Sequence, residues 1–344
     1  MSRFVDAPAL WKVLRTGDVR ARLRATRDGI AAIRLHVAGA ALATGVLDAL
    51  AAGSASTAEL AHETGAADER LLETFLRVVA STGLVRGGGD EGPWRLTARG
   101  RAVIDDPLVR ASYEGFPGLH TALYRDLGPL LAGGPRRRDI AESGELIARL
   151  SGGFEPLVLG RLTRAVTERA PRRVLDVGCG AGLELAAMLA AVPQAEGIGL
   201  DVDAGAVELA DRTLAVRGLS ARARVLHLDV RQADAEPSLA EPFDVALLAN
   251  VLYYLPMAER VAFLRTVAEL LVPGGLLILV TTVAAPQFFS RHFDLLLQAQ
   301  EGQMELSDAD TLADQLRQAG FVPGPVEPVA AGTPIVTMTA ERVG

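Results

Sequence analysis

Three glycines directly after an apolar segment have the spacing of a loop that holds a nucleotide-type cofactor. In VLDVGCGAGLE, Gly178, Gly180 and Gly182 let the backbone turn tightly and approach a ligand where a Cβ atom would collide. Asp201 ends the next strand-like segment, 23 residues beyond Gly178, in position for the two hydroxyls of a ribose. These residues predict a cofactor site at the ends of two neighbouring strands.

Two chemistries compete for this loop, hydride transfer from a dinucleotide and methyl transfer from S-adenosylmethionine. A dinucleotide loop is spaced G-x-G-x-x-G, whereas this loop is D-x-G-x-G-x-G, with Asp176 two residues before the first glycine. A carboxylate there repels a pyrophosphate and suits the ammonium of an amino acid. Asp229, which closes VLHLDV, is a third acid at a strand end, placed to accept from an adenine amino group. The acids therefore favour S-adenosylmethionine.

The elements that must position these residues alternate between strand-like and helical patterns. From residue 172 onward the strand-like segments are RRVLDVG, AEGIGLDV, ARVLHLDV, FDVALLANV and GGLLILVTTV. This alternation predicts an α/β fold with a parallel, doubly wound, Rossmann-like sheet. The tail AGFVPGPVEPVAAGTPIVTMTAE predicts a C-terminal antiparallel hairpin added to that sheet.

The N-terminal part predicts a mainly helical unit. One apolar helix is expected over 27–52 and should be buried on more than one side. A second helix starts with the capping-box pair Ser56 and Glu59, and a third ends at Gly83. The segment LVRGGGDEGPWRLTARG then predicts a hairpin, so these elements make a winged-helix unit. We expect a dimerisation domain at 1–105, a helical connector lining the substrate pocket at 106–170 and a catalytic domain at 171–344.

A winged helix also suggests a DNA-binding regulator, whose third helix would enter a major groove. The charges oppose this alternative, because Asp68, Glu69 and Glu73 outnumber Arg70 and Arg77 on that helix, and the net charge of the chain is -7. We expect no nucleic-acid partner. The apolar first helix instead favours a second copy of the chain, hence a homodimer.

Composition sets the broad class of the protein. The chain has 344 residues, with 49% hydrophobic and 22% charged content, enough for two domains with their own cores. A single cysteine, Cys179, excludes an internal disulfide and a multi-cysteine zinc site. No apolar run approaches the roughly 20 residues of a membrane span, and no signal-peptide pattern opens the chain. A cytoplasmic protein is therefore expected, with no membrane partner.

With these motifs assembled, residues 171–344 resemble a class I S-adenosylmethionine-dependent methyltransferase. Together with the winged-helix region, nearly the whole chain resembles the dimeric small-molecule O-methyltransferase family. The segments that carry the resemblance are VLDVGCGAG, GLDVD, HLDV, FDVALLANVLYYLP, LLVPGGLLILV and LTARG. It implies that the methionine part is held by Asp176, Gly178, Gly180 and Gly182, the ribose by Asp201 with Val202, the adenine by Asp229 with Val230, and the sulfonium end by Asn250.

The acceptor side departs from the family pattern. In the family a histidine follows the fourth strand in a VLHxW-like stretch and deprotonates a hydroxyl, whereas this chain has VLYYL, with Tyr253 at that position. Thr281 or Thr282 stands near the place where an acidic partner often follows the fifth strand. Tyr253 could orient the substrate, only pack, or act as the base, although its reference pKa near 10 suits that role poorly. An acceptor that is already acidic, or a free amine, needs little help, which leaves C-, O- and N-methylation open.

Two histidines are further candidates for a displaced general base. His120 and Tyr124 share one helical face in LHTALYRDL, and His292 lies in FFSRHFDLLLQ, a segment that resembles the substrate-lining helix of the family. A packed histidine is the alternative for each of them. A metal site built on the pair has no local ligand spacing to support it, so no metal is predicted.

The sequence therefore predicts a methyltransferase that acts on a small molecule, with natural-product biosynthesis as the context that the resemblance implies. The alternative is a protein of the same fold that binds S-adenosylmethionine but catalyses hydroxylation, decarboxylation or cyclisation, because a fold does not determine its chemistry.

Overall fold

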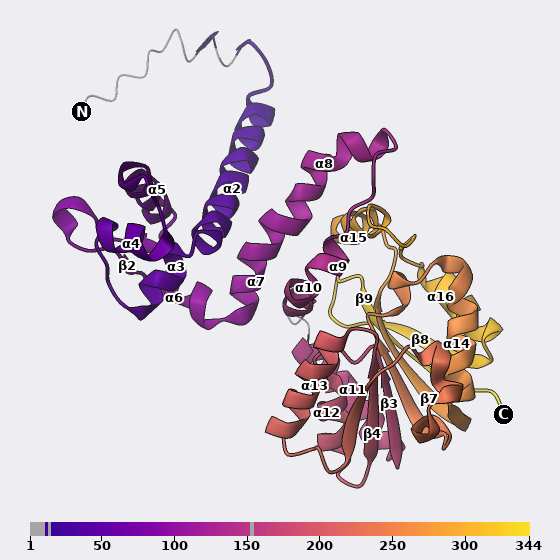
Figure 1. The fold of residues 1–344 in the computed structure, drawn as a ribbon. Helices are drawn as coiled ribbons and strands as arrows, with labels where there is room; N and C mark the ends of the chain where they lie inside the picture. The colour runs from indigo at the N-terminus through magenta and orange to yellow at the C-terminus, as the bar shows by residue number, and fades with distance from the viewer. Residues whose placement is uncertain (1–10, 13–14, 152–154) are drawn as a thin grey trace. The chain divides into compact units, whose positions relative to one another are not determined.

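A computed structural model of the chain describes residues 11–12, 15–151 and 155–344. The chain divides into two compact units, Met1–Arg125 and Asp126–Gly344, which are considered separately below (Figure 1). The boundary between the units falls inside the connector that the sequence predicts at 106–170. Residues 107–120 of that segment pack with the N-terminal helices, and residues 155–169 share a hydrophobic core with the sheet.

The first unit is mainly helical with one small hairpin. Its elements are α2 (Val19–Ala43), α3 (Val46–Ala52), α4 (Thr57–Thr64), α5 (Glu69–Ser81), β1 (Val85–Arg86), η1 (Gly89–Glu91), β2 (Arg95–Leu96), α6 (Ala98–Asp105), α7 (Pro107–Gly115), η2 (Phe116–His120) and α8 (Thr121–Leu131), which runs past the unit boundary. Leu47, Leu60, Leu76 and Trp94 lie in its core. The predicted capping box of α4 is present, because Ser56 and Glu59 each bond the other's backbone N–H.

The predicted single helix over 27–52 is wrong in two respects. The chain forms two helices, since Thr44 ends α2 and Gly45 takes a left-handed φ of 75° before α3. The first part of α2 is not buried either, because Leu23, Ile30 and Ile33 are 63%, 47% and 63% exposed. Among the described residues no single helix has the length and apolarity to span a membrane, although α2 and α3, bent by 61°, meet that test when joined.

The second unit is an α/β domain around one seven-stranded sheet, as predicted. Its strands are β3 (Arg173–Val177), β4 (Glu196–Asp201), β5 (Ala223–His227), β6 (Phe243–Ala249), β7 (Leu271–Thr282), β8 (Phe321–Pro328) and β9 (Ile335–Arg342). They lie in the order β5-β4-β3-β6-β7-β9-β8, and β9 runs antiparallel to β7 and to β8. The C-terminal hairpin therefore extends a parallel five-stranded sheet.

Helices cover both faces of the sheet (Figure 1). The helices of this unit after α8 are α9 (Asp139–Glu142), α10 (Gly144–Ser151), α11 (Glu155–Arg169), α12 (Leu183–Ala191), α13 (Ala204–Val216), α14 (Arg260–Glu269), α15 (Phe288–Gln298) and α16 (Ala309–Gln318). One core joins α11, α12 and α13 to the sheet, and a second core joins α14 and α16 to it. The strand order reverses between β3 and β6, so the carboxyl ends of these strands form the edge where such sheets bind ligands.

Candidate cofactor and acceptor site

The loop between β3 and α12 needs glycine at three positions for different reasons. Gly178, Gly180 and Gly182 have φ values of 75°, 51° and 71°, a region that L side chains rarely adopt. A Cβ atom on Gly178 would lie 2.4 Å from Val251 Cγ2, and one on Gly182 would lie 3.0 Å from Ala210 Cβ. A Cβ atom on Gly180 would meet nothing within 4 Å, so this part of the loop faces open space.

Asp176, the last residue but one of β3, is a buried carboxylate with an unused oxygen. It is 1% exposed, and it accepts the backbone N–H of Leu185 from the first turn of α12. Its Oδ2 has no hydrogen-bond partner among the described residues. Burial raises the pKa of this carboxyl well above its usual value, and the nearby Glu184 and Asp201 raise it further. A buried polar atom without a partner indicates a missing ligand group.

Asp201 shapes the same loop from the end of β4. Its Oδ2 accepts the N–H of Gly180 at 2.9 Å, and its Oδ1 accepts the N–H of Asp203 at 2.9 Å. Val202, the next residue, is 68% exposed at this edge of the sheet. The carboxylate of Asp201 therefore holds the glycine loop in place and lies beside the open space in front of it.

The carboxylate of Asp229 already has hydrogen-bond partners within the protein, which the sequence does not show. It caps the 3₁₀ helix η4 (Val230–Ala235) through the N–H of Arg231, and the Arg231 guanidinium binds the same carboxylate with an Nη2–Oδ2 distance of 2.6 Å. The hydrogen bond from Arg231 lowers the pKa of Asp229. Val230 is 2% exposed and packs in the core. An adenine amino group would therefore have to share this carboxylate with Arg231.

Asn250 directly follows β6 in a left-handed conformation, with φ of 59°. Its N–H donates to the carbonyl of Val280 on the neighbouring β7 at 2.8 Å, which anchors this conformation. Asparagine tolerates the left-handed region better than most residues, and non-glycine residues in this region cluster at functional sites. Asn250 thus ends its strand at the same sheet edge as Asp176 and Asp201.

Tyr253 lies in the 3₁₀ helix η6 (Leu252–Tyr254), within an aromatic cluster. It is 5% exposed and packs against Leu297 and Leu306, and its ring meets the edge of Phe293 with centroids 5.4 Å apart. Burial raises the pKa of Tyr253 well above its usual value, and the hydrogen bond that its hydroxyl donates to Tyr254 raises it further. A phenol in this state holds its proton and is a poor general base.

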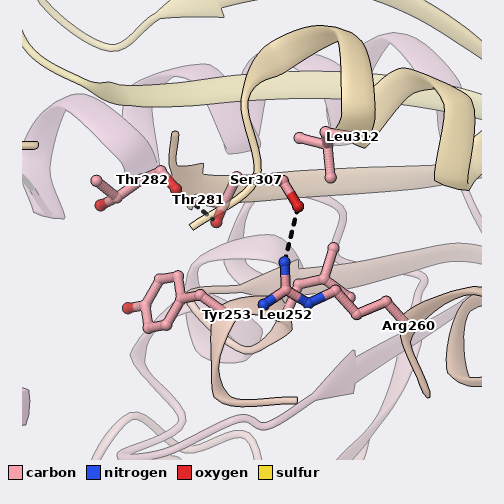
Figure 2. A pocket seen from close by; sticks show the side chains of 7 residues that line it. All are labelled: Leu252, Tyr253, Arg260, Thr281, Thr282, Ser307 and Leu312. Atoms are coloured by element: carbon pink, nitrogen blue, oxygen red, sulfur yellow. Dashed lines mark hydrogen bonds between the residues drawn. The ribbon is translucent and has the colours of Figure 1, made fainter. Parts of the chain in front are cut away.

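A small cavity of about 10 Å³ lies beside this tyrosine, with room for about one water molecule. Figure 2 shows its lining side chains, which come from η6, the start of α14, the end of β7, the segment before α16 and α16 itself. They are Leu252, Tyr253, Arg260, Thr281, Thr282, Ser307 and Leu312. Thr281 and Thr282, which stand near the place where the family often has an acidic partner, therefore line this small cavity.

Arg260 is a buried cation that sequence inspection missed, because an arginine in the first turn of a helix gives no sign of burial. It is 1% exposed and donates to the carbonyls of Leu255 at 3.0 Å and Glu305 at 2.6 Å, and to Ser307 Oγ at 2.7 Å. Figure 2 shows the bond to Ser307. Burial lowers the pKa of Arg260. The guanidinium thus ties the segment after β6 to the segment after α15.

The two histidines belong to different compact units. His292 lies in α15, is 7% exposed and stacks on Phe288 with centroids 6.1 Å apart, and burial lowers its pKa. His120 lies in the π-helical turn η2 of the first unit, is 8% exposed and has its ring centroid 4.8 Å from that of Phe116. In the part of the chain that the structure describes, no group of three or more His, Cys, Asp or Glu could hold a metal ion.

The strand ends of this site fall within a segment that matches a known family. Residues 175–277 match the model of a methyltransferase domain. The chain carries a methyltransferase domain. Its cofactor is S-adenosylmethionine, and the residues fit this group, because the unused oxygen of Asp176 can accept an ammonium and Gly180 leaves space for the ligand.

Relatives of the methyltransferase agree with this assignment. It is 29% identical to the 2,7-dihydroxy-5-methyl-1-naphthoate 7-O-methyltransferase of Streptomyces carzinostaticus over 318 residues, which cover 86% of this chain and 91% of the relative. It is 37% identical to a ubiquinone biosynthesis O-methyltransferase of Caulobacter sp. (strain K31) over 129 residues, which cover 36% of this chain and 47% of the relative. The chain thus aligns with about half the length of the second relative.

Solved structures share the fold of this methyltransferase over most of its length. The mitomycin 7-O-methyltransferase MmcR has a TM-score of 0.74 at 22% identity, and the match covers 94% of this chain and 99% of that one. The O-methyltransferase NcsB1 from neocarzinostatin biosynthesis, solved with S-adenosylmethionine and 2-hydroxy-5-methyl naphthoic acid, has a TM-score of 0.62 at 25% identity, with 91% and 96% coverage. The likeness therefore extends over both the helical N-terminal part and the sheet of this chain.

Proposed function

We propose that this methyltransferase acts on a small natural-product-type acceptor, through a site at the carboxyl ends of β3, β4 and β6. The buried, unpartnered Oδ2 of Asp176 beneath a left-handed glycine loop carries this proposal, because it calls for a ligand cation beside a close backbone approach. The relative from Streptomyces carzinostaticus, which aligns over 86% of the chain, supports an aromatic hydroxy acid as the class of acceptor.

In this proposal each strand end binds one part of the cofactor. Asp176 takes the ammonium of the methionine part, and the backbone of the three loop glycines faces its remaining atoms. Asp201 accepts from the ribose hydroxyls beside Val202. Asp229 and Val230 border the adenine, and Asn250 stands at the sulfonium end.

When bound, S-adenosylmethionine would supply an activated methyl group for transfer to the acceptor. The protein must hold the acceptor in line with that methyl group and exclude water. The aromatic cluster around Tyr253 and Phe293 gives the acceptor side an apolar wall. Tyr253 orients the acceptor or shapes this wall and does not remove its proton, since burial raises its pKa.

The acceptor atom therefore either carries an acidic proton or needs no deprotonation before it receives the methyl group. An oxygen acceptor is favoured because the relatives that align over most of the chain are named as O-methyltransferases. A carbon or nitrogen acceptor remains compatible with a site that lacks the histidine after the fourth strand.

His292 is the described histidine nearest in sequence to the aromatic wall, and burial lowers its pKa, so it would be largely neutral at pH 7 and able to accept a proton. His120 is the corresponding candidate from the first unit.

Incubation with methyl-labelled S-adenosylmethionine and 2,7-dihydroxy-5-methyl-1-naphthoate tests this function. We expect a labelled product by mass spectrometry and an equal amount of S-adenosylhomocysteine. A cell extract containing the native acceptor, added in a parallel reaction, extends the test beyond this one probe. Conversion of an acceptor without consumption of the cofactor would instead support the alternative, a non-methylating reaction on the same fold.

A further inference from the structure

A short segment of the connector, residues 137–140, docks on the chain that follows α15. The N–H of Arg137 donates to the carbonyl of Ala299 at 2.9 Å, and the carbonyl of Arg137 accepts the N–H of Glu301 at 2.9 Å. These bonds form a short parallel bridge between Arg137 and Gln300. Both segments lie in the second compact unit, so the bridge joins two parts of one domain that are far apart in sequence.

A buried amide and an ion pair fasten this bridge. Gln300 is 3% exposed; its Nε2 donates to Asp139 Oδ2 at 2.9 Å, and its Oε1 accepts the N–H of Ile140 at 3.4 Å. Arg137 donates to Asp139 with an Nε–Oδ2 distance of 2.5 Å, and to Asp126 with an Nη1–Oδ2 distance of 2.6 Å. We call Arg137, Asp139 and Gln300 the connector latch. Its bonds are directional, unlike apolar packing, so they determine which connector residue stands against the chain after α15.

The connector latch places Ile140 in the aromatic cluster of the second unit. Ile140 directly follows Asp139, is half-buried, and packs against the cluster formed by Tyr253, Leu297 and Leu306. Its branched Cβ restricts the side chain to few rotamers, so it presents a surface of defined shape. A residue from the connector therefore adds to the wall that the elements of the catalytic domain begin.

The segment after the bridge bends sharply back to the same wall. Gly302 and Gln303 have φ values of 97° and 56°, and non-glycine residues with a left-handed backbone are concentrated at functional sites. Beyond this bend Met304 packs against the aromatic cluster, and the N–H of Leu306 donates to Asp294 Oδ1 on α15 at 2.8 Å. The bridge and the bend thus direct two segments to one apolar surface.

We propose that Ile140 limits the size of the acceptor that the site takes, and that Gln300 is the positioning residue that holds Ile140 in place. This inference rests on the proposed function, in which the aromatic cluster contacts the acceptor. A bulkier acceptor collides with the Ile140 side chain, whereas a smaller acceptor fits beside it. One methyl-sized group in an apolar pocket typically changes the specificity of an enzyme by about tenfold or more.

The first test compares 2,7-dihydroxy-5-methyl-1-naphthoate with 2,7-dihydroxy-1-naphthoate, which lacks the methyl group. In Ile140→Ala the ratio of kcat/KM for the larger to the smaller acceptor should rise about tenfold, and the dissociation constant for S-adenosylhomocysteine should stay within about twofold of that of the wild type. Leu131→Ala is the matched control, because it removes an apolar side chain that is 78% exposed at the end of α8 in the same connector. It should leave the ratio unchanged.

Two outcomes of this test contradict different claims. An active wild-type enzyme whose ratio is unchanged in Ile140→Ala would overturn this inference alone. A wild-type protein that binds S-adenosylhomocysteine but methylates neither naphthoate would refute the acceptor class of the proposed function, and this inference with it.

The second test concerns the positioning role. Gln300→Leu keeps a side chain of similar size and removes the amide, so KM for 2,7-dihydroxy-5-methyl-1-naphthoate should rise about fivefold with kcat within about twofold. Hydrogen exchange at the amides of Arg137 and Glu301 should become faster. Gln298→Leu, which alters an exposed amide on α15, is the control and should change neither. Faster exchange at unchanged KM would overturn the positioning role, and the ratio in Ile140→Ala still decides the inference if Gln300→Leu does not fold.

Discussion

At the scale of single residues, Asp201 combines a structural and a ligand-binding role. Its carboxylate holds the N–H of Gly180 and borders the space in front of the loop. Asp201→Ala should therefore weaken the affinity for S-adenosylhomocysteine about tenfold or more. The substitution removes a charged hydrogen-bond acceptor from both the loop and the ribose. Calorimetry measures this change. Asp211→Ala, at an exposed position on α13, serves as the control, and undiminished affinity in Asp201→Ala would refute the ribose assignment.

Tyr253 gives a prediction about turnover and pH. Its hydroxyl donates to Tyr254 and holds its proton, so Tyr253→Phe should retain kcat within about threefold. The rate of the wild-type enzyme should also show no tyrosine ionisation up to about pH 10, since burial raises this pKa above its reference value. Steady-state kinetics with an acceptor that the enzyme methylates checks both points. A loss of a hundredfold or more in kcat at unchanged KM would mean that the phenol takes part in proton transfer.

At the scale of elements, Arg260 connects two segments that are distant in sequence, the one after β6 and the one after α15. Arg260→Met would leave the carbonyls of Leu255 and Glu305 and the hydroxyl of Ser307 without this donor. The free energy of unfolding should fall by about 3 kcal/mol, against about 1 kcal/mol for Ser307→Ala, which removes only one of the acceptors of Arg260. Urea unfolding followed by circular dichroism compares the two variants. Equal stability of Arg260→Met and the wild type would show that the buried cation is not needed to join these segments.

At the scale of the whole molecule, the exposed apolar face of α2 gives a prediction about assembly. Leu23, Ile30 and Ile33 are each about half exposed or more in the single chain, and a partner copy would cover them. We expect the protein to sediment at twice 36.2 kDa and Ile33→Glu to sediment as a monomer. Val216→Glu changes an apolar residue that is 88% exposed on α13 and should not alter the mass. A wild-type monomer at micromolar concentration would contradict the homodimer.

The sheet and the glycine loop could be predicted because their signals are local. Alternating strand and helix patterns repeat over short windows, and D-x-G-x-G-x-G places an acid and three permissive residues within seven positions. The capping box at Ser56 is local in the same way. The break at Thr44 and Gly45 was missed, because the apolar period continues across it and a single glycine is tolerated within many helices.

The charge environment of the site needed the tertiary structure. The sequence by itself determined a doubly wound sheet, a loop built for close backbone approach and an acid at each of three strand ends. Only the tertiary structure showed that Asp229 is already bound by Arg231, that Tyr253 is buried, and that Asp176 is buried with one carboxylate oxygen that has no partner among the described residues. Backbone pattern depends on neighbours along the chain, whereas the protonation and pairing of a side chain depend on burial and on charges brought from other elements.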